Sequence, residues 1–434
     1  MINFHKNNLI YYSLVLLPFT YLIGIFITEL FVLTIISYFF IKNRDLNFFR
    51  DKKFIFLGLI SIYFGINAFI QINDDLKISS IFHFRYIIFS LSVFFCLKYF
   101  ENIQYNIRSK ILFVIFTLVA LILFDALLQF FTGENLLGYK IIKNRISGIF
   151  ETELILGSFL IKVLPFLTWL LFYADLNIVK YKKRLIVFFS FYIICIFLSG
   201  ERTALGLSLL YFVGIVIFLI PLRKIFLFSF SGLIFFIIFI SYFQIGKSDP
   251  NNRIFIKTFN QFTNHHFITN NSEELFQKDT KEKKKIIKKN ILIFSKDHTG
   301  HIQLALKLFK ESPIFGVGPK GFRNYCRKVE YDPEVGICST HPHNFLIQII
   351  SETGLIGFSL YIYIIFFLIF KLFRCRYFNS SSKNKFSFMI ISIGLLINLF
   401  PFLPSGNFFN NWISIINYYL LGIYFYNYNK VFSR

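Results

Sequence analysis

The sequence has little charge. Aspartate, glutamate, lysine and arginine make up 16% of its 434 residues, against roughly 25% in soluble domains. Hydrophobic residues make up 56%, and phenylalanine alone occurs 64 times. This composition excludes an ordinary soluble domain, because a membrane-spanning helix needs about 20 mostly apolar residues and such stretches recur along the whole chain. The N-terminus also lacks an apolar segment followed by a small-residue cleavage site, so we expect no removable signal peptide.

The apolar runs predict an all-α polytopic membrane protein with about twelve transmembrane helices, so the lipid bilayer is its first expected partner. Nine spans fall within residues 1–243 and three within 344–434. A large, partly helical loop at 244–343 separates spans 9 and 10. The predicted spans are 9–24, 27–41, 54–72, 84–100, 111–131, 154–174, 185–200, 203–220, 225–243, 345–370, 386–403 and 412–429.

Acidic residues are also scarce. The 46 lysines and arginines outnumber the 23 aspartates and glutamates, giving a formal net charge of +23. Most cations outside the large loop lie in connections on one side of the predicted membrane. Because inner connections are rich in lysine and arginine, this asymmetry predicts cytoplasmic termini and an outer large loop. The charge therefore requires no nucleic acid partner.

The predicted outer loop is long enough to suggest a function of its own. Its basic run at 281–285 does not alter the topology, because long translocated loops escape the charge bias. A solvated helix face explains this run. The alternative is attraction to anionic lipid headgroups or to an acidic glycan.

Cysteine occurs only five times. Cys326 and Cys338 both lie in the predicted outer loop, where an oxidising compartment would let them pair. We predict a disulfide that closes a small loop before the next helix. The alternative is a metal site with His341 and His343, but the spacing Cys-x11-Cys-x2-His-x-His is not a standard zinc pattern. No metal or other cofactor is therefore predicted.

A charged turn, residues 199–204 (Ser-Gly-Glu-Arg-Thr-Ala), lies between two apolar helices at the outer boundary. Arg202 opens the second helix, where free N–H groups and the helix dipole also favour an anion such as a phosphate. The alternative is an arginine that faces the lipid headgroups. A second outer segment, 143–151, carries Arg145 and can add to the same anion-binding region.

His343 stands at the mouth of the tenth predicted span. The unperturbed pKa of histidine side chains suits proton transfer near neutrality, so a histidine beside an anion site is a candidate general base. His341 is a weaker candidate, because a proline separates the two histidines. Asn344, Gln348 and Glu352 recur every four residues and share one helix face. This polar stripe must face partner helices or a wet cavity, either for function or as interhelical hydrogen bonding.

Three further features accompany this pattern. The glycines of residues 316–321 spell GxGxxG, but no strand–helix unit surrounds them, so we predict a tight loop and no dinucleotide site. Gly354 and Gly357 are predicted to be close-packing positions. Lys162 lies inside the sixth span, where a lysine needs a partner, and Asp125 of the fifth span is one candidate.

Four motifs, in one order over about residues 120–370, resemble the O-antigen ligase and O-antigen polymerase superfamily of bacterial envelope enzymes. The ligase pattern is His, then Asn, Ser or Gln, nine residues, and Gly-x-x-Gly. Here His343-Asn344, nine residues and Gly354-Leu355-Ile356-Gly357 are similar to it. The other similar motifs are Pro313-Ile314-Phe315-Gly316-Val317-Gly318, Ser199-Gly200-Glu201-Arg202-Thr203-Ala204 and Arg145-Ile146-Ser147-Gly148-Ile149-Phe150.

The resemblance implies inverting, metal-independent glycosyl transfer on the periplasmic face of the bacterial inner membrane, with the large loop in the periplasm. The donor would be a glycan on undecaprenyl diphosphate. Arg202 would hold the diphosphate, and His343 would deprotonate the acceptor hydroxyl. The family often carries a second arginine at the start of a loop helix, where this chain has His301. His301, Arg323 or Arg145 would then supply the second cation.

Three functions follow from these patterns. A ligase would pass the finished glycan to lipid A-core or to another glycan or protein acceptor. A polymerase would pass a growing chain to another carrier-linked repeat unit, and the two share a donor site. The His-Asn spacing favours the ligase. A non-enzymatic lipid-glycan transporter is the third, and it would not need a histidine beside an outer arginine.

Overall fold

The computed structural model describes residues 2–42, 52–71, 81–102, 105–260, 296–327 and 339–432. Regular structure in these residues is helical, apart from two isolated bridges at 134–145. This confirms the all-α class. The α-helices are α1 (Ile2–Thr20), α2 (Ile25–Lys42), α3 (Lys52–Gln71), α5 (Phe84–Tyr99), α6 (Tyr105–Thr132), α7 (Leu156–Tyr173), α8 (Ile178–Leu198), α9 (Arg202–Phe218), α10 (Ile220–Phe243), α12 (Lys296–Glu311), α13 (Phe322–Arg327), α14 (Phe345–Arg374), α15 (Ser382–Asn398) and α16 (Asn411–Phe432).

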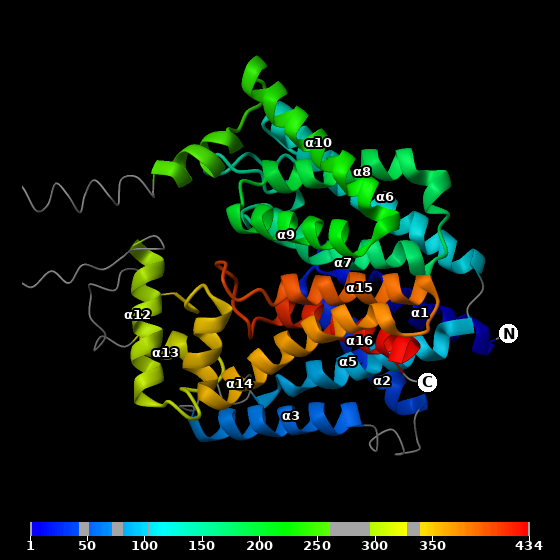
Figure 1. Cartoon of the computed structure of the whole chain (residues 1–434). Helices are drawn as coiled ribbons and strands as arrows, with labels where there is room; N and C mark the ends of the chain where they lie inside the picture. Colours follow the sequence, from blue (N-terminus) through cyan, green and yellow to red (C-terminus); the bar gives the residue numbers. More distant parts are fainter. Residues whose placement is uncertain are drawn as a thin grey trace, which may run out of the picture.

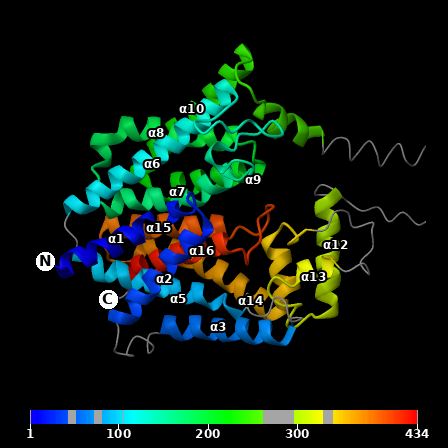
Figure 2. The ribbon, with the colours of Figure 1, turned by 180° about the vertical axis from the view of Figure 1, so that it is seen from behind.

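Most helices run side by side in two groups (Figure 1). One group holds α6 to α10, and the other holds α1, α2, α3 and α5 with α14 to α16. Helices α7 and α15 pack against each other where the groups meet; α7 is buried along nearly its whole length, and α15 is largely buried from Ser387 onward. Figures 1 and 2 show both termini at one end of the bundle and α12 lying across the other end.

Several helices have the length and composition of membrane spans. Among the described residues these are Ile25–Lys42, Ile107–Thr132, Leu156–Tyr173, Ile220–Phe243 and Phe345–Tyr377, with shorter apolar helices at Leu9–Thr20, Ile55–Phe69 and Arg202–Phe218. A multi-pass membrane protein is therefore supported. The count of twelve spans and the sidedness remain predictions.

Part of the predicted outer loop, 261–295, lies outside the described residues, and so does its basic run. Cys338 lies outside them as well. Cys326 is disulfide-bonded, and its pairing with Cys338 remains a prediction. The described parts of the loop include α12 and α13.

Side-chain caps fix several helix starts. The side chains of Asn177, Asn344 and Ser381 accept hydrogen bonds from backbone N–H groups in the first turns of α8, α14 and α15. Such caps satisfy N–H groups that have no partner inside the helix. The cap at Asn344 matters most, because it sets the start of α14 two residues after His343.

Helix α14 is interrupted at Gly354, whose backbone angles (φ 61°, ψ −166°) are not helical. This backbone region is essentially restricted to glycine. The interruption frees backbone groups that bind residues 313–318. The hydrogen bonds run from Val317 N to Ser351 O (3.0 Å), from Gly318 N to Glu352 O (2.9 Å) and from Leu355 N to Pro313 O (2.8 Å).

The two segments approach so closely that a side chain would not fit between them. A Cβ on Gly354 would lie 2.2 Å from Ile314 O, and a Cβ on Gly316 would lie 2.5 Å from the backbone of Glu352. Asn67 and Tyr63 of α3 also donate to backbone oxygens here, those of Phe315 and Thr353. The predicted close-packing role of Gly354 is confirmed, and residues 313–318 form a backbone contact with α14.

We predict that Gly354→Ala lowers the stability of the folded protein by at least about 2 kcal/mol, because alanine disfavours this backbone region and its Cβ would collide with Ile314. The measurement is the midpoint of thermal unfolding of the detergent-solubilised full chain. Gly65→Ala in α3 is the matched control, since a Cβ there meets nothing within 4 Å. Equal midpoints for the two variants would contradict the assigned role.

Candidate functional site

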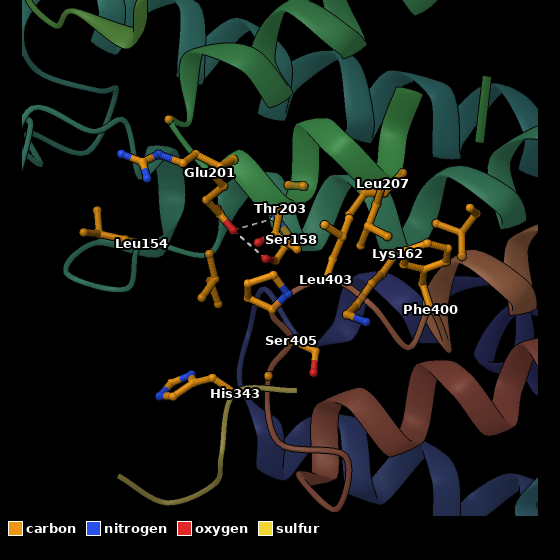
Figure 3. A pocket seen from close by; sticks show the side chains of 18 of the residues that line it. Leu154, Ser158, Lys162, Glu201, Thr203, Leu207, His343, Phe400, Leu403 and Ser405 are labelled. Atoms are coloured by element: carbon orange, nitrogen blue, oxygen red, sulfur yellow. Dashed lines mark hydrogen bonds between the residues drawn. The ribbon is translucent and has the colours of Figure 1, made fainter. Parts of the chain in front are cut away.

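A cavity of about 1010 Å³ lies where the two helix groups meet (Figure 3). Arg202 and His343, the two residues on which the sequence prediction rested, both line it. The lining comes from six segments: residue 145, the start of α7, the turn 199–204 with the start of α9, residues 253–260, the approach to α14, and the end of α15 with the chain after it. Its charged and titratable residues are Arg145, Lys162, Glu201, Arg202, Arg253, Lys257, His341 and His343.

The turn before α9 is tied to the segment that follows α10. Gly200 adopts φ +67°, and a Cβ there would lie 2.9 Å from Arg253 Cδ. Arg253 Nε donates to Gly200 O at 3.0 Å, and Arg202 Nε donates to Arg253 O at 3.1 Å. These reciprocal bonds hold two guanidinium groups at the cavity. The sequence analysis missed Arg253, which stands in a polar segment without a recognisable motif.

Arg145 supports the same turn from another segment. It donates to Ser199 O (3.2 Å) and to Leu154 O (2.8 Å), and it forms an ion pair with Glu201 at 3.6 Å. Burial lowers the pKa of Arg145, as does the nearby charge of Arg253, while Glu201 acts in the opposite direction. Arg145 therefore lines the cavity and also shapes it.

Glu201 caps the start of α7. Its carboxylate accepts hydrogen bonds from Gly157 N (2.8 Å) and Ser158 N (3.2 Å) and from the Ser158 hydroxyl. Burial raises the pKa of Glu201, while the Ser158 bonds, the Gly157 bond and Arg145 lower it. A helix N-terminus stabilises a carboxylate placed there. The Glu201 carboxylate is thus held in place by hydrogen bonds from the first residues of α7.

The segment that carries Arg145 is fixed by polar side chains of α6. Gln129 Oε1 accepts from Ser147 N (3.1 Å) and Gly148 N (2.8 Å). Asp125 accepts from Asn135 Nδ2 (3.2 Å) and from Leu136 N (2.9 Å). Asp125 is therefore engaged with this segment, while Lys162, its candidate partner from the sequence, lines the cavity.

His343 reaches the cavity with a backbone angle that non-glycine residues rarely adopt, φ 57°. Ser405 N donates to His343 O at 2.8 Å, which ties the chain before α14 to the chain after α15. The imidazole Nε2 lies 3.0 Å from the Ser339 hydroxyl. The His343 ring centroid lies 5.4 Å from that of His301 and 4.2 Å from that of His341, so three predicted site histidines come together.

Both ring nitrogens of His341 lie within hydrogen-bonding distance of protein groups. Its Nε2 lies 3.1 Å from Ser405 O, to which it can only donate, and its Nδ1 lies 3.0 Å from the Thr340 hydroxyl. Burial lowers its pKa to about 3, and the neighbouring His343 contributes. His341 is therefore neutral at physiological pH and packs against the ring of His343.

The polar stripe of α14 binds protein groups. None of its three side chains lines the cavity. Gln348 Nε2 donates to Glu352 and Asn407, and its Oε1 accepts from the Phe408 N–H. Glu352 also accepts from Lys320 N (3.1 Å) and Phe322 N (3.0 Å). Asn344 Nδ2 donates to Pro401 O (2.9 Å). Of the two roles that the sequence left open, this geometry fits hydrogen bonding between elements.

The candidates for a second anion contact separate in space. Arg145 lines the cavity with Arg202, and His301 contacts the His343 ring. Arg323 does not line the cavity, although its charge contributes to the lowered pKa of His341. Within the described ranges, no group of three or more His, Cys, Asp or Glu side chains is arranged to hold a metal ion.

Apolar helices and a cavity lined by clustered arginines and a histidine define a multi-pass membrane protein with a basic cavity between its helix groups. A protein-family model described as O-antigen ligase matches residues 186–362. This match confirms the resemblance to the O-antigen ligase superfamily, and its range includes Arg202, Arg253, His301 and His343. No curated protein matches the chain. The family suggests a ligase- or polymerase-type glycosyl transfer with a carrier-linked glycan and an acceptor.

We predict that His341 makes stability depend on pH. Above its ordinary pKa of 6.5 it is neutral whether the chain is folded or unfolded. Below 6.5 the unfolded chain takes up a proton that the folded chain, with a pKa of about 3, does not. The contribution of His341 to stability therefore falls by about 1.4 kcal/mol for each unit by which the pH drops between roughly 6.5 and 3.

The measurement is the unfolding midpoint of the parent and of His341→Gln between pH 7.5 and 5.5. The glutamine can still donate to Ser405 O but does not titrate, so its profile should be flatter. The groups with charges that act on His341, namely His343, His301 and Arg323, are present in both proteins. Parallel profiles would argue against a buried, neutral His341.

Proposed function

We propose that this protein is an O-antigen ligase-type glycosyltransferase. It moves a glycan from undecaprenyl diphosphate to a hydroxyl of lipid A-core or a similar acceptor, on the periplasmic face of the inner membrane. The observation that carries the proposal is one cavity lined by Arg145, Arg202, Arg253 and Lys257 together with His343. Clustered cations with a histidine suit a reaction that needs an anionic leaving group and a base.

The cations activate the leaving group. When the glycosyl bond breaks, negative charge grows on the diphosphate oxygen that leaves the sugar. Preorganised guanidinium groups stabilise that charge more than they stabilise the ground state, which lowers the barrier. Arginine suits this role, because its planar fork binds phosphate oxygens in pairs. Arg202 and Arg253 each donate to a backbone oxygen of the other's segment, so their side chains need little reorganisation when the donor binds.

His343 activates the acceptor. A hydroxyl that bonds to the sugar carbon as the diphosphate leaves must lose its proton, and imidazole accepts one near neutral pH. The Ser339 hydroxyl, 3.0 Å from Nε2, supports this role, since it shows that a hydroxyl fits beside that nitrogen. Attack on the face opposite the diphosphate inverts the configuration at that carbon, and no step requires a metal.

The apolar part of the cavity suits a lipid-linked donor. Ile161 of α7, Leu207 of α9, and Ile397 and Leu403 of the α15 region line it. Hydrocarbon and pyrophosphate can then bind together, one against apolar side chains and the other against cations. Holding the donor and the acceptor in one cavity beside the catalytic base replaces a chance encounter in solution with a reaction between positioned groups.

We predict that His343→Ala lowers glycan transfer at least about 100-fold, the scale of a lost general base. Arg202→Ala should lower transfer to a similar extent, and Arg202→Lys should restore only part of it, because lysine cannot bind in a bidentate manner. Transfer is measured with purified protein, lipid-linked donor and acceptor. Exposed Lys140→Met is the control and should retain full transfer. Normal transfer in either alanine variant, with normal membrane insertion, would overturn the assigned roles.

A polymerase is the alternative, because its donor site would be the same. The two predict different accumulating molecules when the gene for this chain is deleted. Loss of a ligase should leave long glycan chains on the lipid carrier, whereas loss of a polymerase should leave acceptor capped with single repeat units. Analysis of carrier-linked and acceptor-linked glycans by mass spectrometry distinguishes them, and capped single units would contradict the ligase assignment.

A further inference from the structure

One end of the cavity lies deeper in the helix bundle than the arginines. In Figure 3, Lys162 lies with Phe400 and Leu403 at this end, away from Glu201 and His343. Asn398, the last residue of α15, lines the same cavity. The neighbouring lining residues are largely apolar. A lysine and an asparagine in such surroundings require an explanation that the proposed chemistry does not provide.

Lys162 is a cation without a counterion in the described part of the chain. No carboxylate among the described residues forms an ion pair with it, and Asp125 is engaged elsewhere. Its Nζ lies over the ring of Phe345, 6.0 Å from the ring centroid. An ionisable side chain inside a membrane helix normally marks a functional site, because it is costly to place there.

Asn398 is 2% exposed, and neither its Oδ1 nor its Nδ2 has a hydrogen-bond partner within the part of the chain that the structure describes. Each buried group left unsatisfied costs about 1–3 kcal/mol. The Nδ2 group, a buried donor without an acceptor beside a cavity, points to a ligand that supplies acceptor oxygens. That ligand must also suit the lysine, so it carries anionic oxygens.

We propose that Lys162 and Asn398 form a subsite for the phosphate nearest the hydrocarbon chain of a lipid-linked phosphate. The ammonium and the amide N–H groups donate to phosphate oxygens, and the apolar lining contacts the start of the chain. This inference rests on the proposed function, since it takes the lipid carrier of the donor as the occupant.

The depth of the subsite supports this assignment. Glu201 bonds Gly157 N and so fixes the level of the arginine-bearing turn on α7. Lys162 lies five residues further along, about 7–8 Å deeper at 1.5 Å per residue. A carrier diphosphate enters with its hydrocarbon in the membrane and its glycan outside. The arginines then face the phosphate joined to the sugar, and Lys162 faces the phosphate joined to the lipid.

The test measures binding of undecaprenyl monophosphate, which has only the lipid-side phosphate and cannot react. The full chain is placed in nanodiscs of zwitterionic lipid, and binding is measured by native mass spectrometry. We expect Lys162→Met to weaken binding at least 10-fold and Asn398→Leu to weaken it several-fold. Lys140→Met, which removes an exposed lysine, should leave it unchanged. Parental affinity in both Lys162→Met and Asn398→Leu would overturn the proposal.

A second arm distinguishes the source of the phosphate. The same variants are titrated with phosphatidylglycerol, a phospholipid that also presents a lipid-linked phosphate. The carrier assignment predicts that its binding is weak and insensitive to Lys162→Met. Equal losses for the two lipids would overturn the carrier assignment in favour of a bilayer phospholipid.

Stability without ligand separates binding from a structural role. Removing an unpaired buried charge or two unsatisfied amide atoms should leave the unfolding midpoint unchanged or raise it. A lowered midpoint with unchanged lipid affinity would show that the pair is structural. Failure of the proposed function would look different, because His343→Ala and Arg202→Ala would then retain transfer whatever the Lys162 variant binds.

Discussion

The site depends on the contact between two backbones, residues 313–318 and the interrupted turn of α14 at Gly354. Hydrogen bonds that a continuous helix would keep to itself run instead to a second segment, and no side chain fits between them. This contact fixes the first turns of α14, and through the Asn344 cap it fixes the residue before them, His343. Glu352 strengthens the same junction by accepting from the N–H groups of Lys320 and Phe322. Gly316 and Gly354 therefore act by allowing close approach, and neither lines the cavity.

The sequence was sufficient to bring the main site residues together. Polar residues at the ends of apolar helices meet at one end of a bundle, so Arg202 and His343 could be expected in one cavity. The all-α class followed from composition and the length of the apolar runs. Arg253 and Lys257 could not be found in this way. Their segment is held at the cavity by side-chain-to-backbone hydrogen bonds between residues 51 and 53 apart in the chain, and neither periodicity nor a motif marks those bonds.

A polar side chain in an apolar helix indicates that it has a hydrogen-bond or ion-pair partner, but it does not identify that partner. Gln348 and Glu352 were expected to face inward, and they do, but their partners are loop amides and Asn407. Asp125 was a candidate for Lys162, yet its oxygens bind the segment before Arg145. A backbone N–H is invisible in a sequence pattern because every residue except proline carries one. Predictions made from side chains alone therefore favour ion pairs over side-chain-to-backbone bonds.

The cap at the start of α7 has a consequence for the electrostatics of the cavity. Glu201 is next to Arg202 in the chain and within 3.6 Å of Arg145, so a mobile carboxylate here would be a tethered competitor for the cations. The N–H groups of Gly157 and Ser158 hold it in place, and the positive end of the α7 dipole offsets its charge. An acid in the middle of an anion site is thereby kept from acting as an inhibitor built into the chain, and the cavity keeps its positive potential for a molecule that arrives from outside.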